Sequence, residues 1–145
     1  MSNPKGSFLT AKKHLEKQGV KTIGCSRLWQ SPAWPLGQGR PDFINAVVKF
    51  EFGQGPEALM SILLSTEDEL GRVRSVPNAS RIIDLDLLIY GEETRKTKDL
   101  SLPHPRMLDR AFVLLPLCEL DPSWISELAK LPMRDINAMK YIGRW

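Results

Sequence analysis

Two aspartates, Asp84 and Asp86, stand two residues apart in the otherwise apolar stretch RIIDLDLLIYG, residues 81–91. Because side chains of a strand alternate between its two faces, both carboxylates would project from the same face, roughly 7 Å apart along the chain. Such like charges repel each other unless a positive charge lies between them. Carboxylates at this spacing can share divalent cations, and Mg²⁺ is usually held by one or two carboxylates plus substrate phosphates. The alternative is a solvent-exposed strand end whose two charges face water.

Basic residues surround the aspartate pair in the sequence. Arg72 and Arg74 end the preceding predicted helix, and Arg81 stands three residues before Asp84. Phosphoryl transfer needs metal ions that bridge oxygens and guanidinium groups that neutralise developing charge, so this pattern favours that chemistry. A helix C-terminus that favours cations, with ordinary surface arginines, is the alternative. More basic residues follow the aspartates: Arg95, Lys96, Lys98, Arg106 and Arg110. Together they favour a polyanionic ligand, and among such ligands phosphate groups over a nucleic-acid backbone.

Other motifs narrow the chemistry. The chain contains neither G-x-x-x-x-G-K-[ST] nor G-x-G-x-x-G, which excludes a P-loop kinase, and two histidines support neither a zinc site nor a serine triad. His104, between prolines, would bond a phosphate or cap the following helix. Phe43 and Asn45 border a Pro/Gly-rich loop, and Phe112 follows Arg110. An aromatic ring and an amide suit a planar heterocycle, whereas the alternative places both phenylalanines in the core.

The elements that would position these residues follow from periodicity and turn residues. We expect helices over 7–18, capped by Ser7 and ended by Gly19, and from Pro56 to Gly71. The buried stripe of the second helix would be Leu59, Leu63, Thr66 and Leu70. Strands are expected over 20–29, 43–52 and 81–91, a buried helix in the second half of 100–120, and short helices over 124–130 and 133–141. This order predicts an α+β fold.

The totals predict one soluble globular domain, residues 1–145. Hydrophobic residues make up 42% of the chain and charged residues 26%, with a net charge of +3. Cys25 and Cys118 are expected as buried, reduced thiols. No apolar run approaches the roughly 20 residues of a membrane span, and the first residues do not resemble a signal peptide. We therefore expect a cytoplasmic protein without a membrane partner.

Three blocks in order, PDFINAVV, GRVRSVPNASRIIDLDLLIYG and LSLPHPRMLDRAFVLLPLCEL, resemble the 6-hydroxymethyl-7,8-dihydropterin pyrophosphokinase family. The resemblance covers nearly the whole chain. It implies a ferredoxin-like antiparallel sheet with helices, and transfer of pyrophosphate from ATP to the hydroxymethyl group of 6-hydroxymethyl-7,8-dihydropterin, giving AMP, in folate biosynthesis. The implied substrates are that pterin and ATP, the implied cofactor is Mg²⁺ as two ions, and the expected state is a monomer that binds no nucleic acid.

The resemblance also assigns residues by position. Asp84 and Asp86 match the ligands of both Mg²⁺ ions, and with Arg72 and Arg81 they form the implied catalytic set. The residues implied in ATP binding are Glu67, Arg72, Arg74, Arg81, Ser101, His104 and Arg110. Those implied in pterin binding are Phe43, Asn45 and Phe112.

The chain departs from the family pattern in three places. NAS replaces the family's Trp-Gly-Pro before Arg81 in a loop that is shorter than in some members, which predicts a lid that closes differently. Asp99, beside Lys98, stands where a basic residue is common, which would weaken nucleotide binding. The family's first strand is missing, so we expect either an upstream start or a weakly folded, gapped sheet. The alternatives are a catalytically impaired relative and an α+β nucleic-acid-binding domain.

Overall fold

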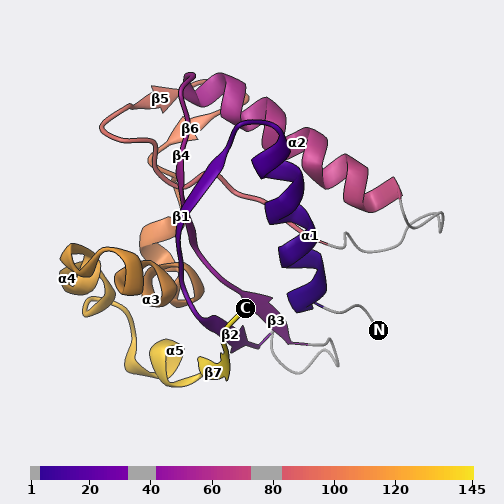
Figure 1. The fold of residues 1–145 in the computed structure, drawn as a ribbon. Helices are drawn as coiled ribbons and strands as arrows, with labels where there is room; N and C mark the ends of the chain where they lie inside the picture. The colour runs from indigo at the N-terminus through magenta and orange to yellow at the C-terminus, as the bar shows by residue number, and fades with distance from the viewer. Residues whose placement is uncertain (1–3, 33–41, 73–82) are drawn as a thin grey trace. The chain divides into compact units, whose positions relative to one another are not determined.

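The computed structural model describes residues 4–32, 42–72 and 83–145 (Figure 1). The chain forms two compact units: unit 1 consists of Met1–Thr22 and Phe50–Pro105, and unit 2 of Ile23–Lys49 and Arg106–Trp145. Helices and antiparallel strand pairs occur in both, so the predicted α+β class is confirmed.

Two helices, α1 (Pro4–Lys17) and α2 (Pro56–Arg72), lie side by side in unit 1 (Figure 1). Pro56 opens α2 as predicted, because its fixed φ suits a first turn whose N–H groups have no helical partner. The predicted stripe of α2 is confirmed, since each member is at most 7% exposed: Leu59, Leu63, Thr66 and Leu70. The helix continues one residue past Gly71, the predicted end.

Helix α1 begins earlier than predicted and ends where predicted. It starts at Pro4, so Ser7 lies inside the helix and is not its cap. Gly19 has a φ of +87°, a conformation that glycine adopts without the penalty of a Cβ atom. The N–H groups of Gly19 and Val20 donate to the carbonyls of Glu16 and Leu15, at 3.1 and 3.0 Å, and satisfy the last turn.

Two adjoining apolar clusters form the core of unit 1. The first contains buried Leu15, Val20, Leu59 and Leu63, packed by Phe50, Phe52, Ile62, Leu85, Leu87 and Tyr90. The second contains buried Ala11, Leu70 and Ile83, packed by Phe8 and Leu85. Leu85 belongs to both, so the segment that carries the aspartates is part of this core.

Residues 83–90 were predicted as a strand, but no strand forms over them. Exposure nevertheless alternates over residues 83–87, with Ile83, Leu85 and Leu87 facing the core and Asp84 and Asp86 exposed. A strand requires a ladder of backbone hydrogen bonds with a neighbour, and alternation alone does not provide one. The prediction of the exposed face was correct, and the prediction of a paired strand was wrong for the described residues.

A short hairpin follows in unit 1. Strands β5 (Arg95–Lys96) and β6 (Ser101–Leu102) pair antiparallel, with Arg95 opposite Leu102 and Lys96 opposite Ser101. The sequence prediction missed both strands because their composition is polar and each contains only two residues. The hairpin matters for the site because it presents residues 98–101.

Unit 2 contains a three-stranded antiparallel sheet in which β2 (Leu28–Ser31) pairs with β3 (Phe43–Asn45) and β7 (Lys140–Gly143). The predicted apolar helix is α3 (Ala111–Leu120). The 3-10 turns are η1 (Met107–Asp109) and η2 (Pro122–Trp124), and the short helices are α4 (Ile125–Leu128) and α5 (Met133–Asn137). The predicted last helix therefore ends early, and β7 occupies the remainder.

Both long strands predicted before α2 are interrupted at the same point. Strand β1 (Lys21–Cys25) pairs with β4 (Val48–Glu51), while β2 and β3 belong to the other sheet. Ser26 donates its N–H to the Val47 carbonyl, and its hydroxyl accepts the Val47 N–H, both at 2.8 Å. Because the Ser26 side chain replaces a backbone partner here, the ladder breaks and each predicted strand becomes two.

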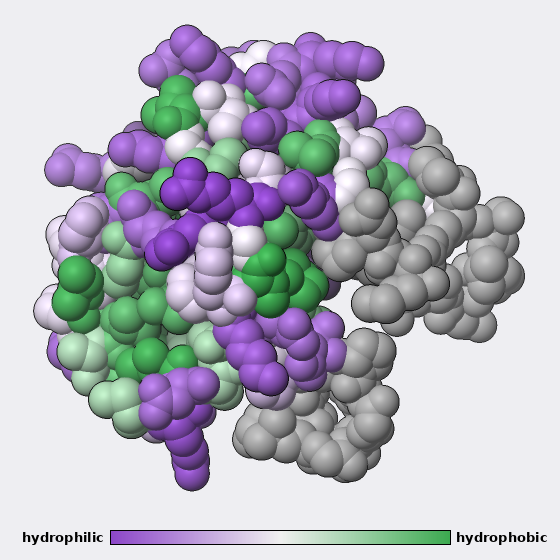
Figure 2. Space-filling view, turned by 60° about the horizontal axis from the view of Figure 1, so that its bottom comes forward, coloured by the Kyte–Doolittle hydropathy of each residue, from purple (hydrophilic) through white to green (hydrophobic). Residues whose placement is uncertain are grey.

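The surface mixes hydrophilic and hydrophobic residues, as Figure 2 shows for one face. Large apolar side chains that are about half exposed or more include Phe43, Leu64, Ile125, Met133 and Tyr141. In the part of the chain that the structure describes, no helix has the length and apolar character needed to cross a membrane.

Candidate active site

The two aspartates lie on the exposed side of residues 83–90 in unit 1. Asp84 and Asp86 are both exposed, while Leu85 between them packs in the core. Backbone hydrogen bonds hold this segment: Leu85 donates its N–H to Glu67 of α2 at 2.6 Å, and Leu88 accepts the N–H of His104 at 2.8 Å. The carboxylates therefore extend from a backbone that is fixed on both sides of Asp86.

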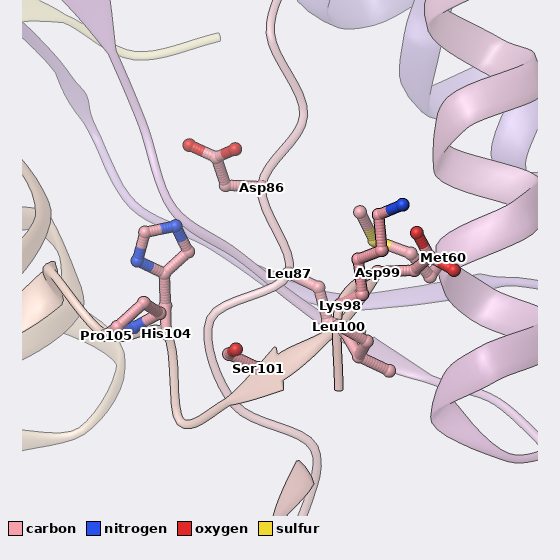
Figure 3. A pocket seen from close by; sticks show the side chains of 9 residues that line it. All are labelled: Met60, Asp86, Leu87, Lys98, Asp99, Leu100, Ser101, His104 and Pro105. Atoms are coloured by element: carbon pink, nitrogen blue, oxygen red, sulfur yellow. The ribbon is translucent and has the colours of Figure 1, made fainter. Parts of the chain in front are cut away.

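A cavity of about 190 Å³ adjoins Asp86. In the view of Figure 3, Asp86 and His104 lie toward one end and Met60, Lys98 and Asp99 toward the other. The remaining lining residues are Leu87, Leu100, Ser101 and Pro105. The cavity thus combines apolar side chains with carboxylate, hydroxyl, imidazole and ammonium groups.

The structure brings together three of the predicted site residues at this cavity: Asp86, Ser101 and His104. Glu67, predicted to bind ATP, contacts the backbone of Leu85. Met60, Lys98 and Asp99 also line the cavity; Lys98 and Asp99 stood out in the sequence only as a departure from the family pattern. Nothing in the sequence identified Met60, which lies on α2 one residue after buried Leu59.

Most of the predicted arginine cluster cannot be placed at this cavity. Arg74 and Arg81 lie outside the described residues, and Arg72 is described only as the last residue of α2. Arg95 forms ion pairs with Glu57, at 2.5 Å, and with Glu93, at 2.7 Å. The Arg95 hydrogen bond lowers the pKa of Glu57, and hydrogen bonds to Glu57 and Glu93 raise the pKa of Arg95. Arg95 is thus engaged by carboxylates.

The residues predicted to bind the pterin lie in unit 2. Phe43 on β3 is 52% exposed, which fits a ring available for stacking and excludes the core alternative for this residue. Asn45 donates from its side-chain amide to the Ser31 hydroxyl at 3.0 Å, which orients the amide. Phe112 on α3 is partly buried, and the Arg110 guanidinium lies 5.4 Å from its ring centroid, within cation–π range.

A second polar cluster in unit 2 was missed by sequence reasoning. Glu119 of α3 accepts hydrogen bonds from Arg27 Nε at 2.6 Å and Trp29 Nε1 at 2.8 Å. The Arg27 guanidinium also lies 4.9 Å from the ring centroid of Tyr141 on β7. Burial raises the pKa of Glu119, but hydrogen bonds from Trp29 and Arg27 outweigh it and leave that pKa below its ordinary value. This cluster ties α3 to both β2 and β7.

The donor set of unit 1 fits Mg²⁺. Asp84 and Asp86 offer hard carboxylate oxygens on one side of an extended backbone, and the cavity that Asp86 lines has room for further oxygen donors. Among the described residues, no group of three or more His, Cys, Asp or Glu side chains is arranged to hold a metal ion. Mg²⁺ commonly keeps waters and binds through one or two carboxylates plus phosphate oxygens, so two aspartates suffice as the protein's share.

Comparison with known proteins decides the family. The family model described as 7,8-dihydro-6-hydroxymethylpterin-pyrophosphokinase (HPPK) matches residues 1–122. The chain belongs to the HPPK family. The match includes all of the predicted site residues, from Phe43 to Phe112, so the resemblance seen in the three sequence blocks is confirmed.

Curated relatives of the HPPK family show the same likeness. The chain is 37% identical over 107 residues to the 2-amino-4-hydroxy-6-hydroxymethyldihydropteridine pyrophosphokinase of Synechocystis sp., covering 74% of this chain and 54% of the relative. It is 44% identical over 87 residues to the enzyme of the same name from Haemophilus influenzae, covering 59% of this chain and 54% of that relative. It is 38% identical over 113 residues to the folic acid synthesis protein fol1 of Pneumocystis carinii, covering 78% of this chain and 15% of that relative. The matches thus span about half the length of the bacterial relatives.

Proposed function

We propose that the chain transfers pyrophosphate from ATP to the hydroxymethyl group of 6-hydroxymethyl-7,8-dihydropterin in folate biosynthesis, and releases AMP. Membership in the HPPK family supports the reaction class. The observation that carries the proposal is the exposed pair Asp84 and Asp86 beside a cavity that Ser101 and His104 also line. The relatives' names, which specify a pyrophosphokinase and folic acid synthesis, support the substrate class and pathway.

In this proposal Asp84 and Asp86 would hold Mg²⁺, expected as two ions, which would neutralise the negative charge of the phosphates. Ser101 and His104, which line the cavity, contact the nucleotide. Arg72, Arg74, Arg81 and Arg110 are proposed phosphate contacts on the family resemblance. Because the hydroxyl of the pterin attacks directly, the protein needs to position and neutralise groups and needs no nucleophile of its own.

Unit 2 supplies the proposed pterin contacts. Phe43 and Phe112 offer aromatic faces for the pterin ring, and Asn45 offers an amide that both donates and accepts hydrogen bonds. The exposure of Phe43 and the oriented amide of Asn45 support these roles. A Phe43→Ala variant should raise the KM for the pterin with little change in the KM for ATP.

The test of the activity is release of AMP from ATP, measured with and without the pterin and with and without Mg²⁺. AMP release that requires both is expected, and Asp84→Asn should abolish it. A folded sample that binds Mg²⁺ and ATP without releasing AMP would identify a catalytically impaired relative and overturn the proposal. Strongly salt-dependent binding of oligonucleotides without nucleotide binding would favour the nucleic-acid-binding alternative.

We also propose that the chain forms a single ferredoxin-like domain. The extended segment supports this, because its exposure alternates as in a strand over residues 83–87. A single domain should unfold in one cooperative urea transition that is the same by fluorescence and by circular dichroism, and two separate transitions would overturn the proposal. A cytoplasmic, monomeric protein remains a prediction of the sequence.

A further inference from the structure

The contact between Glu67 and Leu85 lies at the centre of the aspartate pair. Glu67 is partly buried on α2, and its Oε2 atom accepts the Leu85 N–H at 2.6 Å. Leu85 stands between Asp84 and Asp86, so the bond fixes the backbone of the residue that separates the two aspartates. A charged acceptor makes this bond stronger than an ordinary backbone pair.

Contacts with its neighbours fix the rotation of α2, the helix that carries Glu67, about its own axis. The neighbouring residue Thr66 is fully buried, donates to the Ile62 carbonyl at 2.8 Å and lies 2.9 Å from His14 Nδ1 of α1. Leu63 and Leu70 are buried on the same helix. Because these contacts fix the face that α2 presents, the Glu67 carboxylate is directed at the extended segment.

Hydrogen bonds from outside the segment hold its backbone near Asp86. No strand forms over residues 83–90, so the ladder that usually sets the position of each residue is absent there. Side-chain packing of Leu85 and Leu87 sets which face is buried but leaves the chain able to shift along its own direction. Bonds at the Leu85 N–H and the Leu88 carbonyl remove that freedom on either side of Asp86.

We propose that Glu67 is a positioning residue that holds Asp84 and Asp86 at the spacing required to bind metal, by accepting the Leu85 N–H between them. This inference rests on the proposed function and changes the role of Glu67 from nucleotide contact to support of the metal ligands. Glu67 then acts on metal affinity, while the affinity for metal-free nucleotide depends on other residues.

The test compares Glu67→Ala and Glu67→Gln with Asp68→Asn, an exposed carboxylate next to Glu67 on α2. The first readout is hydrogen exchange of the Leu85 amide in the metal-free protein. Loss of a charged hydrogen bond predicts exchange about tenfold faster in Glu67→Ala. The Gln variant should restore most of the protection, because its amide oxygen still accepts the bond, and the Asp68 variant should match the wild type.

The second readout separates metal from nucleotide. In Glu67→Ala, the Mn²⁺ concentration for half-saturation, measured by electron paramagnetic resonance with a non-hydrolysable ATP analogue, should rise about tenfold. Affinity for the analogue in EDTA should stay unchanged. Unchanged Leu85 exchange, or weaker analogue binding in EDTA with unchanged Mn²⁺ affinity, would overturn the inference. If Glu67→Ala fails to fold, Glu67→Leu, which lacks an acceptor but keeps most of the side-chain volume, replaces it in the same two readouts.

The two proposals fail separately. If the wild type protects the Leu85 amide through Glu67 and binds Mn²⁺ but releases no AMP, the positioning role stands and the proposed activity fails. If AMP is released and Glu67→Ala changes neither Leu85 exchange nor Mn²⁺ affinity, the activity stands and the positioning role fails.

Discussion

Neutralising Asp86 should affect the metal-free protein and its nucleotide complex in opposite directions. Asp86 is exposed, lines the cavity, and stands two residues from Asp84. Without metal, the two carboxylates repel each other, so Asp86→Asn removes an unfavourable interaction. With Mg²⁺ and ATP, the same substitution removes a proposed ligand. A residue with only a structural role would not produce this change of sign.

The size of each effect can be worked out. Two unit charges roughly 7 Å apart interact by about 0.6 kcal/mol at the dielectric constant of water, and the exposure of both side chains favours that limit. Asp86→Asn should therefore raise the metal-free unfolding free energy by at most about 0.6 kcal/mol. A ligand at a hundred times its dissociation constant stabilises the folded state by about 2.7 kcal/mol, and the variant should lose most of this.

The assay is urea unfolding with EDTA and with Mg²⁺ plus a non-hydrolysable ATP analogue. Asp99→Asn is the matched control, because Asp99 lies on the same cavity but outside the aspartate pair. It should keep the ligand stabilisation, and removal of its negative charge should strengthen nucleotide binding. Full Mg²⁺-dependent stabilisation in Asp86→Asn, or a metal-free loss of more than about 1 kcal/mol, would refute the reasoning.

Three further predictions concern each unit by itself. Leu63→Ala, at a side chain that is 4% exposed, should cost about 2–5 kcal/mol in urea unfolding, and a smaller loss than this would show that the core refills the space. The pKa of Glu119 is lower in the folded protein than in the unfolded chain. The ionised Glu119 carboxylate therefore stabilises the fold above about pH 4.3, and this stabilisation is lost as the pH falls through the folded pKa. Glu119→Gln should thus be less stable than the wild type at pH 7, and the difference in unfolding free energy between the two proteins should be smaller at pH 3. An equal difference at both pH values would contradict a stabilising role of the ionised Glu119 carboxylate. Exposed Cys25 should react with a thiol reagent before Cys118, whose pKa is raised by burial and by Asp121, and the order is read from peptide mass.

Helix α2 was predictable because its information is local. Leu59, Leu63, Thr66 and Leu70 recur at helical spacing, and Pro56 marks the start within a few residues of the stripe. Neither signal depends on a partner elsewhere in the chain. The same holds for α3, whose apolar residues come in one run.

Pairing between distant segments was harder to predict. Strand β7 joins β2 across more than a hundred residues, and its letters KYIG carry no alternation long enough to recognise. Ser26 and Val47 interrupt two long alternating runs through a side-chain contact that no local pattern reveals. Cys25 was expected to be buried and is exposed, because it ends β1 next to this interruption.

The aspartate segment shows why exposure and pairing must be predicted separately. Alternation correctly placed Asp84 and Asp86 on one exposed side, since burial of Ile83 and Leu85 requires it. Whether that segment is also held in register depends on hydrogen-bond partners, and here the partner is a helix carboxylate eighteen residues away, Glu67. Metal binding by two carboxylates requires a fixed spacing, so the chemistry of this site depends on the part of the structure that sequence periodicity leaves undetermined. That is why the Leu85 amide, which touches no substrate in the proposed mechanism, is the most informative single atom to monitor.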